Sequence, residues 1–292
     1  MEKIIAAADS ELWFTERMAG TGFQYSLQVA EVLHAERTPF QRLEVFRTTG
    51  FGTAMVLDGF VNVSDKDEFF YHEVMAHPAL FIHERPRRVL IIGGGDCGVL
   101  REVLRHPGIG HVDMVEIDER VVRVSEKFFP ELTASNNDPR ASIRFEDGVA
   151  WVRNAAAGSY DVIIVDSTDP VGPAEGLFGA AFYADCHRIL TDGGMVVVQS
   201  ESPLFHQGRL KEIHRCLRGA GFIDSHPMTY PTVIYGGGTW SSSIARKGRK
   251  LNDGVRWDDI ETCAFPTRYY NRGVHVSLMT LSGYLAPVLD GL

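Results

Sequence analysis

The sequence of 292 residues predicts an α/β protein, with a doubly wound parallel sheet that follows a small N-terminal antiparallel β-domain. From residue 87 onward, short apolar runs alternate with helical patterns at the spacing of βαβ units. These runs are continuously apolar, as expected of strands covered on both faces. Residues 24–64 instead alternate and contain turn residues, which is typical of antiparallel hairpins. We expect the domains to span 1–66 and 67–292.

The N-terminal β-domain is predicted from three short strand patterns, RLEVFRT (42–48), TAMVL (53–57) and FVNVS (60–64). Gly52 and the pair Asp58-Gly59 supply hairpin-type turns between them. Residues 67–83 then have a helical pattern. We expect Pro78 to interrupt this helix, because proline removes a backbone donor.

The larger domain is predicted from five strand–helix pairs in succession. The strands are RVLII (88–92), HVDMV (111–115), SIRF (142–145), DVIIV (161–165) and GMVVVQS (194–200). The helices that follow them lie at 98–106, 119–129, 149–156, 180–190 and 208–221. Past residue 222 the pattern is mixed, with a Tyr/Gly-rich segment at 229–245 and a candidate C-terminal helix.

The composition excludes several classes of protein. The net charge is −9 and no basic patch is visible, so we expect no nucleic-acid partner and favour a cationic substrate. No apolar run reaches the roughly 18 residues that span a bilayer, and the N-terminus lacks the basic region of a secretory signal. We therefore expect a cytoplasmic protein without a membrane partner. The four cysteines lie far apart without a CxxC pair, so neither a disulfide framework nor a metal site is expected.

A glycine turn follows the first strand of the larger domain. Residues 93–98, GGGDCG, fit the pattern GxGxxG at the start of a helix, and Glu116 ends the next strand about 20 residues later. Such glycines allow a ligand to approach the backbone, and Glu116 can accept hydrogen bonds from a ribose. By itself this motif fits NAD enzymes and adenosyl-sulfonium enzymes equally.

Acidic residues follow four successive strands: Asp96, Glu116, Asp147 and Asp166. Ligands of open α/β sheets bind outside the carboxyl ends of the strands, so these acids predict a strongly negative pocket. Asp96 in the glycine turn would repel both a pyrophosphate and the carboxylate of S-adenosylmethionine. It would attract the ammonium of decarboxylated S-adenosylmethionine. We therefore infer adenosine at Glu116 and Asp147, and a positive tail at Asp96.

A second acid, Asp169, follows Asp166 in the stretch DSTDPVGPAEGLF. Pro170 favours an extended Asp169, so the two acids can line one pocket without belonging to a helix. No histidines lie nearby, and the pair suits an organic polycation. The loop 171–178, with its glycines, is predicted to close over the site and exclude water.

Six stretches together resemble the polyamine aminopropyltransferases, above all the spermidine-forming branch of that family. They are DEFFYHEVMAH, VLIIGGGDCGVLREVLRH, VEIDERVV, EDGVAW, DVIIVDSTDPVGPAEGLF and RYYNRGVHVSLMTL. The resemblance runs from about residue 11 to residue 287. It implies an N-terminal β-domain before a Rossmann-like, methyltransferase-type domain, in a homodimer or homotetramer. It also implies transfer of the aminopropyl group of decarboxylated S-adenosylmethionine, as a co-substrate, to putrescine, without a metal or other cofactor.

The resemblance also implies site residues. Asp166 would be the catalytic acid/base, and the diamine side would further comprise Tyr71, His72, Asp96, Asp169 and Tyr235. The nucleoside side would comprise Gln41, Asp96, Glu116, Asp147, Gly148 and Pro173. Two departures affect these assignments: Cys97 stands where the family has glycine, and either Tyr230 or Tyr235 could face the substrate.

Alternatives stay open at this point. A putrescine N-methyltransferase shares the fold and many motifs but must accommodate the carboxylate of S-adenosylmethionine. Another amine could be the acceptor, and a non-enzymatic polyamine or nucleoside sensor would use a similar pocket. An NAD dehydrogenase fits the glycine turn but leaves Asp147 and Asp166 unexplained.

Overall fold

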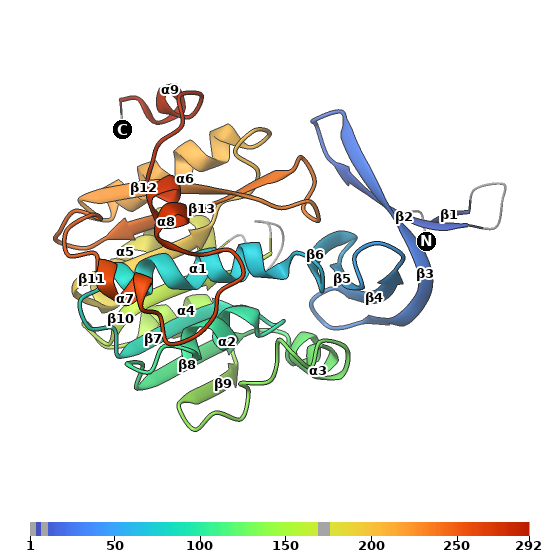
Figure 1. The fold of residues 1–292 in the computed structure, drawn as a ribbon, viewed down its shortest axis with the longest axis horizontal. Helices are drawn as coiled ribbons and strands as arrows, with labels where there is room; N and C mark the ends of the chain where they lie inside the picture. Colours follow the sequence, from blue (N-terminus) through green and yellow to red (C-terminus); the bar gives the residue numbers. More distant parts are fainter. Residues whose placement is uncertain (1–3, 7–10, 169–175, 292) are drawn as a thin grey trace.

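The computed structural model describes residues 4–6, 11–168 and 176–291, which form two sheets with helices around the second (Figure 1). The two sheets lie side by side, and the chain passes from one to the other between β6 and α1. No helix in these described ranges is long and apolar enough to cross a membrane.

The first sheet is antiparallel, with its six strands in sequence order. The strands are β1 (Ile4–Ala6), β2 (Leu12–Met18), β3 (Phe23–Arg37), β4 (Arg42–Thr48), β5 (Thr53–Leu57) and β6 (Phe60–Ser64). The sheet thus begins earlier than the predicted start at residue 24. The pattern of β2 explains the difference, because nearly all of its side chains are at least half-buried and no alternation marks it.

Helix α1 (Glu68–Ile82) begins four residues after the first sheet ends at Ser64; the domain boundary after residue 66 stays a prediction. The expected interruption at Pro78 is wrong, because the helix continues through this proline. Nearly every side chain of α1 is buried, so packing on all sides stabilises the helix despite the missing backbone hydrogen bond.

The second sheet has the strand order β12-β13-β11-β10-β7-β8-β9, and its five strands from β11 to β9 are parallel. These are β7 (Arg88–Gly93), β8 (His111–Glu116), β9 (Ala141–Phe145), β10 (Tyr160–Asp166) and β11 (Leu190–Gln199). The helices between and after them are α2 (Gly98–Leu104), α3 (Glu119–Phe128), α4 (Gly148–Asn154), α5 (Ala180–Ile189) and α6 (Gln207–Gly219). The predicted fold class is therefore confirmed, with one difference at the C-terminal end.

That difference is an antiparallel hairpin at the edge of the sheet. The segment with the mixed pattern forms β12 (Asp224–Pro231) and β13 (Thr239–Arg246), and β13 pairs with β11. Short helices follow, α7 (Trp257–Glu261), α8 (Arg272–Leu278) and α9 (Ala286–Leu289).

Alternate residues of the parallel strands pack on opposite faces of the second sheet. Val89 and Ile91 of β7 pack with α1 and α2, whereas Leu90 and Ile92 pack with α4, α5 and α6. Helix α3 also contacts the first sheet, since Val121 and Val124 belong to the same cluster as its strands β4 and β5. This packing holds the first sheet against the part of the second sheet where the parallel strands end.

Glu73 ties the segment between α7 and α8 to α1. Its carboxylate accepts hydrogen bonds from the backbone N–H groups of Arg268, Tyr269 and Tyr270, at 2.7, 2.9 and 2.6 Å. The side chain is 1% exposed, so water cannot replace these bonds. A buried carboxylate with three N–H donors is therefore a structural anchor.

We expect Glu73→Gln to lower the free energy of unfolding by roughly 2–3 kcal/mol, because an amide nitrogen cannot accept from a buried N–H. Urea denaturation measures this loss. Glu212→Gln, which removes an exposed partner of Arg215, should leave the free energy of unfolding nearly unchanged. Equal stability of the two variants would contradict the anchoring role.

Candidate active site

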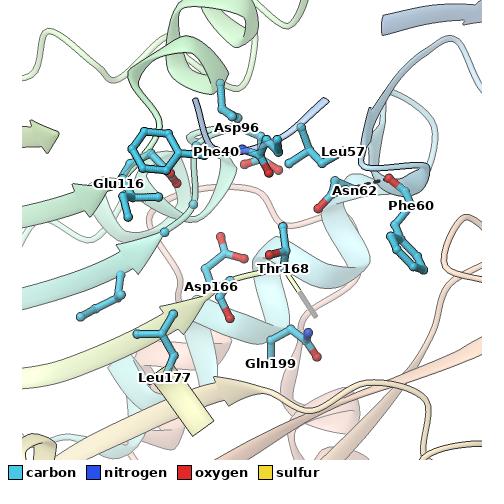
Figure 2. A pocket seen from close by; sticks show the side chains of 18 of the residues that line it. Phe40, Leu57, Phe60, Asn62, Asp96, Glu116, Asp166, Thr168, Leu177 and Gln199 are labelled. Atoms are coloured by element: carbon cyan, nitrogen blue, oxygen red, sulfur yellow. Dashed lines mark hydrogen bonds between the residues drawn. The ribbon is translucent and has the colours of Figure 1, made fainter. Parts of the chain in front are cut away.

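A cavity of about 310 Å³ lies where the parallel strands end against the first sheet. The turns and loops after β7, β8, β9 and β10 form one wall, and residues of β5, β6 and the loop before β4 form another. Figure 2 shows Asp96, Glu116 and Asp166 around this hollow, with Phe60 and Asn62 on the side of the first sheet.

The lining is acidic. It contains six carboxylate side chains, Glu16, Asp58, Asp96, Glu116, Asp147 and Asp166, and no Lys, Arg or His among the described residues. The four acids that end successive strands thus line one pocket, as predicted. A cavity with this lining attracts cations and repels anions.

The glycine turn fits closely around Asp166. A side chain at Gly93 would place its Cβ 2.1 Å from the backbone oxygen of Asp166, and the Gly94 N–H donates to that oxygen at 2.8 Å. Gly93 has a φ of +80°, which favours glycine. Cys97 also has a positive φ of +68° and is buried, so the turn accommodates a side chain at this position.

Asp166 lies at the carboxyl end of β10 and accepts a hydrogen bond from the Tyr71 hydroxyl at 2.6 Å. Burial and then the charge of Asp96 raise the pKa of Asp166 to about 7. Asp166 can therefore exchange a proton near neutral pH, which is the property required of a general acid or base.

Asp96 is held from behind the cavity. His72 Nε2 lies 3.2 Å from one of its oxygens, and the Gly98 N–H donates to the other at 2.8 Å. Burial alone would lower the pKa of His72, but the carboxylates of Asp96 and Glu68 outweigh it and raise the pKa to about 10. His72 is not one of the residues that line the cavity; among the described residues it reaches the site through Asp96.

Glu116 and Gln41 meet at Asp118. The Gln41 side-chain amide donates to Asp118 at 3.0 Å, and the Asp118 N–H donates to Glu116 at 2.8 Å. Burial and the charges of Asp118 and Asp166 raise the pKa of Glu116 to about 7 despite that hydrogen bond. Both Gln41 and Glu116 line the cavity, so a ligand there can contact both sheets.

Asp147 and Gly148 begin α4 at the edge of the cavity. One Asp147 oxygen caps the helix by accepting from the Val149 N–H at 2.8 Å. A Cβ on Gly148 would lie 2.5 Å from the Ile92 side chain, so glycine is required for the helix to pack on β7.

The structure distinguishes the two tyrosines, Tyr230 and Tyr235, that could face a ligand. Tyr235 lines the cavity, its ring centroid lies 5.7 Å from that of Tyr71, and its hydroxyl donates to the Asn62 carbonyl at 2.7 Å. Tyr230 is buried behind this wall, where its hydroxyl pairs with Ser242 at 2.9 Å. Geometry therefore favours Tyr235 as the residue that faces a ligand.

Two of the predicted residues, Asp169 and Pro173, lie outside the described residues, as does the loop from 171 to 175. Conversely, the structure adds residues that sequence reasoning missed: Glu68, Asp118 and Gln199. A signal existed for Asp118, because an Asp directly before Glu-Arg-Val-Val is a typical helix N-cap. No sequence pattern showed that it would also hold Gln41 across the two sheets.

Comparisons with known proteins match the same family along nearly the whole chain. Residues 68–253 match the model of the spermine/spermidine synthase domain, and residues 12–65 match that of the spermidine synthase tetramerisation domain. A polyamine aminopropyltransferase of Methylococcus capsulatus is 50% identical over 284 residues, which are 97% of this chain and 99% of that protein. One from Nitrosococcus oceani is 51% identical over 277 residues, 95% of this chain and 96% of its own.

Solved structures of spermidine synthases match the fold of this chain as well. A crystal structure of spermidine synthase in complex with the transition state analogue AdoDATO has a TM-score of 0.92 at 32% identity, covering 95% of this chain and 94% of that one. The spermidine synthase of Thermotoga maritima has a TM-score of 0.90 at 32% identity, with the same shares covered.

Asp166→Asn tests the raised pKa of Asp166 without any ligand. The folded protein holds the Asp166 proton more tightly than the unfolded chain, so this group's stabilisation is present below pH 4 and is lost as the pH rises to about 7. We expect the variant to be more stable than wild type by roughly 1–3 kcal/mol at pH 8, and by much less at pH 4. Urea denaturation at both pH values measures this; a difference that does not depend on pH would contradict the raised pKa.

Proposed function

The chain belongs to the spermine/spermidine synthase family and is a polyamine aminopropyltransferase, and we propose that it moves the aminopropyl group of decarboxylated S-adenosylmethionine to putrescine. The observation that carries the choice of substrates is the cavity lining, with six carboxylates and no basic side chain among the described residues. Putrescine has an ammonium at each end, and this donor has an ammonium and a sulfonium but no carboxylate. Both substrates therefore match the charge of the site.

We place the adenosine of the donor between Glu116, Gln41 and the start of α4 at Asp147 and Gly148. Glu116 can accept hydrogen bonds from the ribose hydroxyls, and the loop before β4 covers this side with Phe40. Asp96, fixed on both oxygens, then faces the ammonium of the aminopropyl group. Pro173, outside the described residues, is proposed as a further nucleoside contact.

Transfer is a displacement at the methylene carbon beside the sulfonium. The amine nitrogen supplies the electron pair of the new C–N bond, and the C–S pair returns to sulfur, which leaves as the neutral thioether methylthioadenosine. The amine must be neutral to attack, so a base has to accept its proton. We assign that role to Asp166, with Tyr71 orienting its carboxylate and Tyr235 bordering the amine.

The raised pKa makes this proton transfer feasible. An alkyl ammonium has a pKa near 10 and a free Asp one near 4, a gap of roughly six units or about 8 kcal/mol. With the pKa of Asp166 at about 7 the gap falls to roughly three units, or about 4 kcal/mol. Desolvation of the amine narrows this gap further, whereas the carboxylates around it stabilise the ammonium and widen the gap.

Asp169, outside the described residues, is proposed to share the diamine with Asp166, and His72 to act through Asp96 on the ammonium of the aminopropyl group. The sulfonium is its own leaving group, so we propose that no metal or redox cofactor takes part. The match to a tetramerisation domain supports an oligomer; we propose a homodimer or homotetramer in the cytoplasm, and light scattering on the purified protein would give the subunit number.

The direct experiment is to incubate the protein with decarboxylated S-adenosylmethionine and, separately, putrescine, cadaverine, agmatine or spermidine. Mass spectrometry then identifies the products. We expect spermidine from putrescine, together with methylthioadenosine, at a higher kcat/KM than for the other amines. A higher kcat/KM with another amine would show that this amine, and not putrescine, is the preferred acceptor.

Asp166→Asn should lower kcat by roughly 10²–10⁴-fold, the usual contribution of a general base, while donor binding measured by calorimetry stays near that of wild type. The matched control is Asp138→Asn, which removes an acid paired with Arg140 away from the cavity and should leave kcat unchanged. Near wild-type turnover by Asp166→Asn would rule out this residue as the base.

A further inference from the structure

The ring of His72 bridges two carboxylates. Its Nδ1 lies 2.7 Å from Glu68 and its Nε2 3.2 Å from Asp96, and the ring is 1% exposed. Only the imidazolium can donate through both nitrogens. Glu68 is one turn before His72 on α1, and it does not line the cavity.

The start of α2 also packs tightly against the His72 ring. A Cβ on Gly98 would lie 2.2 to 2.5 Å from three ring atoms of His72, so the close approach requires glycine at this position. The Gly98 N–H meanwhile holds the second oxygen of Asp96. The last glycine of the GGGDCG turn therefore fixes His72 and Asp96 together.

Charged groups from two other segments face Glu68. Arg101 of α2 lies 2.8 Å from the oxygen that His72 contacts, and Arg268, before α8, lies 3.5 Å from the other. His72 and Arg101 lower the pKa of Glu68 and keep it ionised despite its burial. Glu68 in turn lies on the far side of His72 from the cavity, where no substrate contact explains its charge.

We propose that Glu68, acting through His72, fixes the direction and the charge of Asp96, and so sets how tightly the enzyme binds the amine end of its donor. This inference rests on the proposed function, because it assigns the donor ammonium to Asp96. Glu68 is a positioning residue: it touches neither substrate nor reacting atom.

The chemistry explains why an acid is needed behind the ring. Without Glu68 one nitrogen of a buried imidazolium loses its partner, and burial then favours the neutral ring. Asp96 would lose the positive charge beside one of its oxygens, so its ionised form, which we assign to the donor ammonium, would require a higher pH.

The test is Glu68→Gln, which keeps the size of the side chain and removes the charge. We expect the donor KM to rise roughly tenfold with a smaller change in kcat, and the acid limb of kcat/KM to move to higher pH. A nitrogen NMR spectrum of the free protein at pH 8 should show His72 doubly protonated in wild type and singly protonated in the variant. This second readout requires no turnover.

Two further variants separate positioning from general loosening of α1. Glu73 is also a buried acid on this helix. Glu73→Gln should therefore lower stability without moving the acid limb of kcat/KM or the His72 signal. In a His72→Gln background, Glu68→Gln should have no further effect on donor KM, because its action passes through the ring.

Three results would overturn the inference. The effects of Glu68→Gln and His72→Gln on donor KM could add in the double variant, or the His72 signal could stay unchanged in Glu68→Gln. Glu73→Gln could also raise donor KM as much as Glu68→Gln does. Failure of the proposed function looks different: the wild-type protein itself would then form no aminopropyl product from decarboxylated S-adenosylmethionine.

Discussion

Burial of several like charges in one cavity is the constraint around which this structure is organised. Carboxylates at the ends of β7, β8 and β10 repel one another and lose hydration, and both effects favour their neutral forms. The structure relieves the repulsion in two ways. Asp166 and Glu116 have pKa values raised to about 7, whereas Asp96 keeps its charge against the imidazolium of His72. The same arrangement places Asp166, which can accept a proton near neutral pH, beside Asp96, which stays charged.

The first sheet completes the site as well as covering it. Asp67, just before α1, accepts hydrogen bonds from the Val233 and Ile234 N–H groups, both at 3.1 Å, and so holds the loop that carries Tyr235. On the opposite side Asp118 holds Gln41 over the strand ends. Asp67 and Asp118 thus each position one side chain that lines the cavity, Tyr235 and Gln41 respectively.

Strand ends could be predicted from the sequence because continuous apolar runs and the acids after them are local patterns. Since the carboxyl ends of parallel strands meet at one edge, four acids far apart in sequence were correctly placed in one pocket. The role of Glu68 behind His72 could not be predicted, because helical spacing shows that two residues share a face but not what that face meets. The strands β2, β12 and β13 were missed for a related reason: the burial of their side chains does not alternate along the strand, so the period-2 signal is absent.

We propose that the cavity selects ligands by positive charge and rejects a donor that carries its own anion. Calorimetric titration of the protein with decarboxylated S-adenosylmethionine and with S-adenosylmethionine tests it most directly, since the two differ by one carboxylate. We expect at least tenfold tighter binding of the decarboxylated form, or about 1.4 kcal/mol. Equal or tighter binding of S-adenosylmethionine would contradict it.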